Sequence, residues 1–432
     1  MDLSISKILI IGIFFVTYYL IIFGKTNKSV VAFSMGLLAA LVKVSKNIKV
    51  SKIGDFIDFN TLGILLGMMI VVGILKTTGV FQAIAGYIVK KSKGNVISIF
   101  ILTLIAVAVL SSMLDNVTTL LLFSPVILLI CQEAEIKPEY FLFPMIFAAN
   151  IGGTATMIGD PPNILVASAS NKGFIEFLSV MILPTLLIFS LTLLFFLFKY
   201  KELKNATPEK FEKLLQIEPS KAITDKKLLY KGLLIFSMVI FGFIIHEYLD
   251  YEASLIALTG GAVMLLVSKK NFEEIAGDVE WNTLFFFVGL FTIVKALEDT
   301  NVITDITRII SSFSNHPLIT LILVLWISGI LAAFIGAVPV VTIFIPIIQK
   351  LILINPYGNE LWWALALGAS LGGNGTISGA ASNMVIVGII ETNFKRKIKF
   401  FDFMKIGIII SLIGLIVSTF YLILRVKILK FL

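Results

Sequence analysis

The chain has 432 residues, of which 58% are hydrophobic and 14% charged, with 36 phenylalanines and a formal net charge of +8. Apolar runs of about 16 to 22 residues recur along its whole length, which is typical of an α-helical protein that crosses the membrane many times. This pattern excludes an ordinary soluble globular protein. The positive charge is better explained by cytoplasmic loops that face anionic lipid than by binding of nucleic acid.

Ten membrane spans are predicted in chain order from these apolar runs. They cover residues 8–23, 30–44, 62–75, 141–169, 174–198, 229–245, 255–267, 284–296, 361–390 and 406–424. A polar stretch over 201–228 separates the fifth span from the sixth and is predicted to be a cytoplasmic linker, because it is too short for a core of its own.

Two further regions, 96–131 and 318–354, differ from single spans. Each consists of two apolar segments joined by polar or small residues, SSMLDNVTT in the first and AAFIGAVPV in the second. Short arms and a polar tip favour a re-entrant hairpin, although two complete spans remain the alternative for each region.

The two halves of the chain share landmarks in the same order. Asn60-Thr61-Leu62 matches Asn282-Thr283-Leu284, Gly67 matches Gly289, and Val80 matches Val302. We therefore predict an all-α polytopic membrane protein with an inverted repeat over 1–200 and 229–432. Each repeat has five transmembrane helices and one re-entrant hairpin, and the broken helices 141–169 and 361–390 lie at the midplane.

The side of the membrane is predicted from loop charge. The loops at 90–93, 199–231, 269–270 and 395–399 are rich in lysine and fall on one side, which is therefore expected to be cytoplasmic. Both termini would lie outside. The hairpin 96–131 would enter from the cytoplasm and the hairpin 318–354 from outside.

Two glycine-rich motifs interrupt apolar runs, NIGGTATMIGDPPN from Asn150 and SLGGNGTISGAASN from Ser370. A matched pair of such interruptions indicates the binding site of a secondary transporter. The candidate substrate-binding residues are Asn150, Gly152, Gly153, Thr154, Thr156, Asn163, Gly372, Gly373, Asn374, Thr376, Ser378 and Asn383. Each of their polar side chains has helix–helix hydrogen bonding as an alternative role.

Carboxylates at membrane depth are costly and mark candidate ion sites. The candidate ion-coupling residues are Asp115, Asn116, Thr118 and Asp160, with a possible sodium ligand pair in Asp115 and Asn116. Asp115 could instead lie in a loop between two spans, and Asp160 could instead cap the half-helix that follows Pro161.

Neither motif contains lysine or arginine. An anion would therefore be bound by half-helix N-termini and neutral donors, and a neutral polyhydroxyl species would also suit such a site. The single cysteine, Cys131, excludes capture by clustered thiols.

The segments SSMLDNVTTLLLFSP, NIGGTATMIGDPPNILVA and SLGGNGTISGAASN together resemble the arsenite efflux permease and P-protein group of the ion transporter superfamily. That group is related to citrate–metal transporters and divalent anion/sodium symporters. The resemblance covers most of the chain. It implies a scaffold domain for dimerisation, a mobile transport domain and elevator-type alternating access at the cell membrane. Sodium or a proton would be the coupling ion, with no other cofactor, and some arsenite permeases have an ATPase subunit.

One departure from the family pattern concerns the second hairpin. Relatives commonly carry an Asp-Asn pair there too, but this chain has Gly336 and Ala337. The expected function is secondary transport of a small anion or oxyacid, such as arsenite, antimonite or a carboxylate. The alternatives are a sodium/proton antiporter, an anion channel and, on its two intramembrane aspartates, an aspartyl protease. No nucleotide-binding loop is present, so ATP hydrolysis by this chain is not expected.

Overall fold

The computed structural model describes residues 3–24, 26–201, 203, 218–311, 316–394 and 397–429. Across these residues the regular structure is entirely helical. Eight helices of this described part are long and apolar enough to cross a membrane. The predicted fold class, an all-α polytopic membrane protein, is confirmed.

The first half contains three long helices, a pair of hairpin arms and a broken helix among its elements. They are α1 (Leu3–Phe23), α2 (Lys28–Leu41), η1 (Val50–Asp55), α3 (Phe59–Thr77), α4 (Val80–Lys91), α5 (Val96–Ser111), α6 (Asn116–Glu133), α7 (Glu139–Thr154), α8 (Pro161–Ser170) and α9 (Phe174–Lys199).

The second half follows the same order. Its elements are η4 (Pro219–Ala222), α11 (Lys226–Ile245), α12 (Ala253–Ser268), α13 (Phe272–Asp278), α14 (Trp281–Asp299), α15 (Val302–Ser311), α16 (Pro317–Ile335), α17 (Ala337–Leu351), α18 (Gly358–Gly372), η5 (Gly373–Gly375), α19 (Ala381–Phe394) and α20 (Phe400–Leu429).

Helix crossings show that the halves are equivalent in space as well as in sequence. A Cβ atom added to Gly67 on α3 would lie 2.3 Å from the carbonyl carbon of Ala257 on α12. A Cβ atom added to Gly289 on α14 would lie 2.3 Å from the same atom of Ala32 on α2. The match of Gly67 with Gly289 therefore marks two related crossings, α3 with α12 and α2 with α14.

The helices form two groups. The crossing group consists of α1–α3 and α11–α14, in which α3 packs on α12 and α14 packs on α2. The hairpin group consists of α5–α9 and α16–α20, in which α5 packs on α7 and α16 packs on α18. Contacts of α3 with α8 and of α14 with α17 join the two groups.

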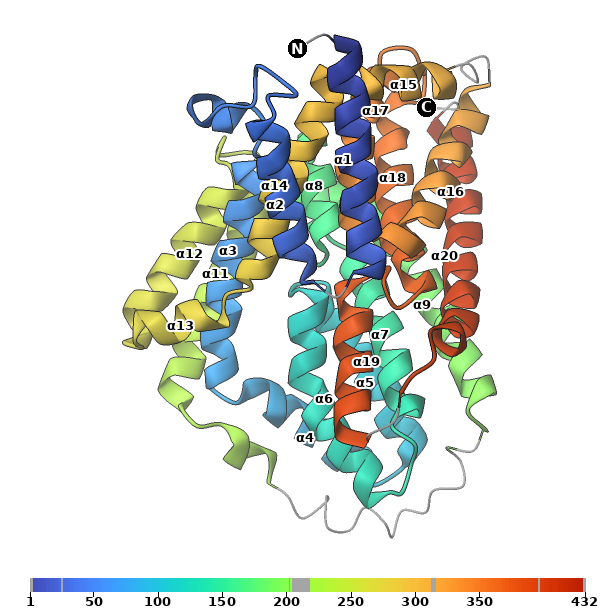
Figure 1. Cartoon of the computed structure of the whole chain (residues 1–432). Helices are drawn as coiled ribbons and strands as arrows, with labels where there is room; N and C mark the ends of the chain where they lie inside the picture. Colours follow the sequence, from blue (N-terminus) through green and yellow to red (C-terminus); the bar gives the residue numbers. More distant parts are fainter. Residues whose placement is uncertain are drawn as a thin grey trace.

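The hairpins approach one another from opposite ends of the molecule. In Figure 1, α5 and α6 occupy the lower half of the view and α16 and α17 the upper half, so that their tips meet near mid-height. Asp115 immediately precedes α6, and Gly336, with a φ of 94°, separates α16 from α17. The arms are longer than the sequence suggested, since α6 has 18 residues and α16 has 19. By length alone, either of these arms could span a bilayer. They are assigned as hairpin arms because their tips end inside the molecule.

Three short helices of the described chain, α4, α13 and α15, were not among the predicted elements. The helices α4 and α15 follow α3 and α14 and connect the crossing group to the hairpin group. In Figure 1, α15 lies across the top of the molecule rather than along its long axis.

Most of the predicted linker 201–228 lies outside the described residues, which omit 202 and 204–217. The segment that returns from it is anchored, because the backbone N–H of Thr224 donates to the carbonyl of Thr78 over 3.0 Å. In Figure 1 both termini lie at the top, opposite the loop between α4 and α5. That the lower side is cytoplasmic stays a prediction.

Candidate functional site

In each broken helix, one asparagine on the second segment forms hydrogen bonds to the backbone carbonyls at the break. The side-chain amide of Asn163 donates to the carbonyls of Gly153, Thr154 and Thr156 over 3.3, 3.2 and 3.0 Å. The amide of Asn383 donates in the same way to Gly373 and Thr376 over 2.9 and 2.7 Å. Both side chains are fully buried. They satisfy carbonyls that the interruption of the helix would otherwise leave unpaired.

The two breaks are bonded to each other. Asn150 Nδ2 donates to Asn374 Oδ1 at 2.9 Å and to Asn383 Oδ1 at 3.0 Å, and its own Oδ1 accepts from Ser382 at 2.6 Å. Ser370 Oγ donates to Asn163 Oδ1 at 3.2 Å. The motifs of the two halves therefore meet in the interior.

Paired glycines bring the broken helices close to the hairpins. A Cβ atom at Gly152 would lie 2.2 Å from the carbonyl oxygen of Ala108 on α5. A Cβ atom at Gly372 would lie 2.1 Å from that of Gly329 on α16. Separations below about 3 Å are not tolerated, so both positions need a residue without a side chain.

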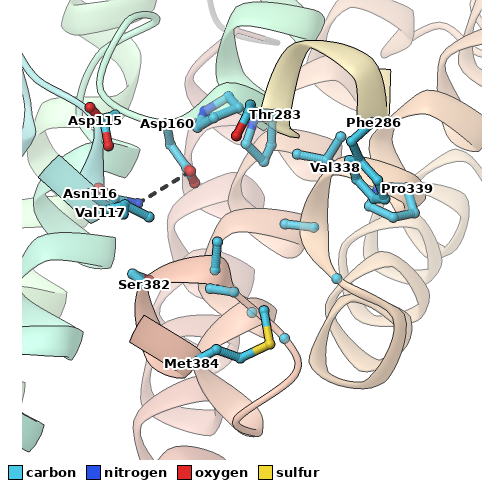
Figure 2. Close-up of a pocket in the computed structure, with 18 of the residues that line it drawn as sticks. Asp115, Asn116, Val117, Asp160, Thr283, Phe286, Val338, Pro339, Ser382 and Met384 are labelled. Atoms are coloured by element: carbon cyan, nitrogen blue, oxygen red, sulfur yellow. Dashed lines mark hydrogen bonds between the residues drawn. The ribbon is translucent and has the colours of Figure 1, made fainter. Parts of the chain in front are cut away.

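A cavity of about 160 Å³ lies where the two tips and the two breaks converge, and we call it the central cavity. Figure 2 shows Asp115, Asn116 and Asp160 on one wall, with Val338, Pro339 and Phe286 on the other side. The cavity has room for several water molecules or a small solute.

The predicted substrate-binding residues divide between this cavity and the packed interior. Those that line the cavity are Asn150, Gly373 and Ser378. The others are buried behind the lining, namely Gly152, Gly153, Thr154, Thr156, Asn163, Gly372, Asn374, Thr376 and Asn383. The threonine hydroxyls at Thr156 and Thr376 donate to carbonyls of Ser112 and Ala333 at the hairpin tips. In this structure the polar side chains of these buried residues form hydrogen bonds that connect the helix breaks with one another and with the hairpin tips.

Three of the predicted ion-coupling residues line the central cavity. Asp115 Oδ1 accepts from the backbone N–H of Thr118 at 2.7 Å, so it caps α6. Asp160 precedes α8 without a capping bond and accepts from Asn116 Nδ2 at 3.3 Å. Thr118 takes part through its backbone and lines a different pocket.

No group of three or more histidine, cysteine, aspartate or glutamate side chains that could hold a metal ion occurs in the described part of the chain. A sodium ion at Asp115 and Asn116, the predicted pair, would therefore need backbone carbonyls or water as further oxygen ligands.

The crossing group adds residues that the motifs did not reveal. Lys28 of α2, and Glu280 and Thr283 at the start of α14, also line the cavity. Glu280 Oε2 accepts from the Thr283 hydroxyl at 2.9 Å. A signal for Glu280 existed, because it stands two residues before the matched Asn282-Thr283 pair. Lys28 lies just before an apolar run and carries no such signal.

Helix N-termini converge on the same space. Six helices of the described chain have residues of their first turn in the lining of the central cavity, namely α2, α6, α8, α14, α17 and α19. Each N-terminus carries about half a positive charge. Side chains cap α2 and α6, and α8 begins with two prolines that have no N–H group. These N-termini contribute positive partial charge to a lining that also holds the carboxyl groups of Asp115, Asp160 and Glu280.

Comparison with known proteins agrees with this architecture. The model of a family described as citrate transporter matches residues 18–368. The 46 kDa membrane protein of Mycobacterium leprae is 34% identical over 425 residues, which cover 97% of this chain and 99% of that protein. The human P protein is 29% identical over 489 residues, which cover 94% of this chain and 58% of that protein.

A solved structure shares the fold. The YdaH transporter of Alcanivorax borkumensis, described as having an unusual topology, matches with a TM-score of 0.60 over 98% of both chains at 14% identity. These matches confirm the resemblance to the ion transporter superfamily that the motifs indicated.

Proposed function

Because the chain belongs to the citrate transporter family, we propose that it is a secondary active transporter of a small anion or oxyacid. Transport across the cell membrane would proceed by elevator-type alternating access, with the hairpin group moving against the crossing group and a proton or sodium gradient supplying the energy. The convergence of six helix N-termini on the central cavity is the observation that carries this proposal.

The second half offers the better anion-binding groups. The helix α17 follows Gly336 and has no side-chain cap, and α19 follows Ala380, whose side chain cannot accept a hydrogen bond. Their first backbone N–H groups are therefore available to a carboxylate or oxyanion. The hydroxyls of Ser378 and Ser382 lie in the same part of the lining.

The first half offers the cation-binding groups. Asp115 and Asp160 both line the cavity from this half. Two ionised carboxylates beside an anion would repel it, and an uncompensated carboxylate is costly at this depth. A proton or sodium ion bound there would remove the repulsion, which couples cation binding to anion binding.

Two features support the proposed sliding of the hairpin group. The cavity reaches the surface beside α19, whose first residue Ala381 is exposed. Towards the other end of the molecule, α8 and α17 pack against α3 and α14. The halves are related by an inverted repeat. A conformation in which the packed end separates and the end beside α19 closes would therefore open the site to the other side of the membrane.

A second candidate is a sodium/proton antiporter. The observation that favours it is the charge of the lining. Among the described residues, the lining has three carboxyl groups, Asp115, Asp160 and Glu280, and one basic side chain, Lys28. Bound cations, without any anion, would neutralise the carboxylates of such a cavity.

A flux screen in proteoliposomes separates the two candidates. Arsenite, dicarboxylates, citrate, phosphate and chloride would be offered under imposed sodium and proton gradients, with sodium/proton exchange measured in the same vesicles. The proposal expects gradient-driven uptake of at least one anion or oxyacid. Sodium/proton exchange without any anion or oxyacid flux would replace it with the antiporter.

A further inference from the structure

Lys28 stands at an unusual place for a lysine. It is the first residue of α2, it is half-buried, and it is the one basic side chain among the described residues that line the central cavity. It comes from the crossing group, whereas Asp115 and Asp160 come from the hairpin group.

The ammonium group of Lys28 has no carboxylate partner in the described part of the chain, although ten ion pairs occur there. A half-buried charge without a partner is energetically unfavourable. An ionisable side chain kept at such a cavity therefore indicates a functional role. An anion that enters the cavity would supply this counter-charge.

The position of Lys28 is fixed to α14. The neighbouring Asn27 accepts from the N–H of Ser29 at 2.9 Å and donates to Asn282 on α14 at 3.2 Å. The helices α2 and α14 cross tightly, since a Cβ atom on Gly36 would lie 2.8 Å from the carbonyl oxygen of Gly289. The lysine would therefore stay with the crossing group when the hairpin group moves.

The inverted repeat shows what stands in the equivalent place at the other side. Ala32 of α2 contacts Gly289, and Ala257 of α12 contacts Gly67, so the two alanines are equivalent. Counting back four residues from each gives Lys28 and Ala253, the first residues of α2 and α12. Of these two equivalent positions, only the one at the start of α2 carries a positive charge.

Building on the proposed function, we propose that Lys28 recognises the negative charge of the substrate in the conformation that opens beside α19. The chemical class implied is a carboxylate or oxyanion that is charged when it binds, rather than a neutral oxyacid. In the opposite conformation the site faces Ala253 and loses this partner. The two sides of the membrane therefore see different affinities for the same anion.

The test compares the concentration dependence of transport from each side. Citrate, a dicarboxylate, phosphate and arsenous acid are offered to vesicles of known orientation that contain wild type or Lys28→Gln. Lys28→Gln is expected to raise the KM of the transported anion about tenfold when the α19 side faces the bath, as for loss of a charge-assisted hydrogen bond. The KM from the other side is expected to stay unchanged. Lys46→Gln, an exposed lysine outside the cavity, is the matched charge control.

A second variant guards against a folding defect. Lys28→Cys in a Cys131→Ser background is treated with an aminoethyl or a methyl thiosulfonate reagent. Restoration of the low KM by the aminoethyl group alone supports the proposal. An unchanged KM in Lys28→Gln, or equal rescue by both reagents, overturns the role of Lys28 while anion flux in wild type keeps the proposed function. Absence of anion flux in wild type overturns both.

Discussion

The two hairpin tips occupy equivalent places in the repeat and differ in chemistry. The first tip carries Asp115 and Asn116, and the second carries Gly336 and Ala337. The same contrast recurs at the breaks, where Asp160 of the first half stands opposite Ala380 of the second. An inverted repeat supplies matched helix ends, and side chains then assign them different tasks. On this account the hairpin group binds the cation with groups of the first half and the anion with groups of the second half, and Lys28 of the crossing group adds a positive charge for the anion.

The strongest test of the shared backbone is a pair of glycine substitutions. Gly152→Ala and Gly372→Ala should each lower the free energy of unfolding by ~3 kcal/mol or more, because the new methyl group would overlap a carbonyl oxygen. Thermal unfolding in detergent measures this. Gly388→Ala on α19 is the control, since nothing lies within 4 Å of its added Cβ atom. If one substitution destabilised the protein and the other did not, the two halves would not be equivalent at these positions.

The asparagines that close the breaks should also behave alike. Asn163→Ala and Asn383→Ala each leave buried carbonyls unpaired and should cost ~1–3 kcal/mol of unfolding free energy. Their unfolding midpoints in detergent would be compared with that of Asn393→Ala, an exposed residue on α19. If either break variant matched the control in stability, that asparagine would be free for substrate instead.

The division of tasks can be disturbed by placing a carboxylate in the second half. Ala380→Asp copies Asp160 at the start of α19 and should raise the KM for the anion about tenfold, because a fixed negative charge would repel it. Ala380→Asn has a similar size without the charge and should change the KM much less. Equal effects of the two variants would show that shape rather than charge matters there.

The smallest effect is expected at the helix caps of the crossing group. Glu280 lines the central cavity, whereas Asp58, its counterpart before Asn60-Thr61, lines a separate pocket and caps α3 through the N–H of Thr61 at 3.1 Å. Glu280→Gln should lower the anion KM a few-fold by removing a negative charge. Asp58→Asn should leave the KM unchanged and cost at most about 1 kcal/mol of stability. The flux and unfolding assays above measure both.

Much of the architecture could be predicted from the sequence because glycine, proline and polar residues are rare inside apolar helices and carry a strong signal. The breaks after Thr154 and Gly372 and the tips at Asp115 and Gly336 were located in this way. Helix length was less predictable, since α6 and α16 are long enough to span and become hairpins only through what their tips contact.

The site was harder to predict than the fold. Sequence reasoning located Asp115, Asn116 and Asp160 but gave no reason to choose between ligation and packing for residues such as Asn163. That choice depends on which carbonyls lie nearby once both breaks meet. Lys28 and Glu280 reach the cavity through the crossing of α2 with α14, a long-range contact that no local pattern encodes.

The most direct test of the account is gradient-driven anion uptake by wild type and Asp115→Asn, with Asp160→Asn measured alongside. Neutralising a half-buried carboxylate lowers its desolvation cost, so the Asp115→Asn protein should fold. Wild type is expected to accumulate labelled anion when a sodium or proton gradient is imposed, and Asp115→Asn to lose that dependence on the gradient. Full gradient-driven accumulation by Asp115→Asn would contradict the assignment of cation coupling to the first half.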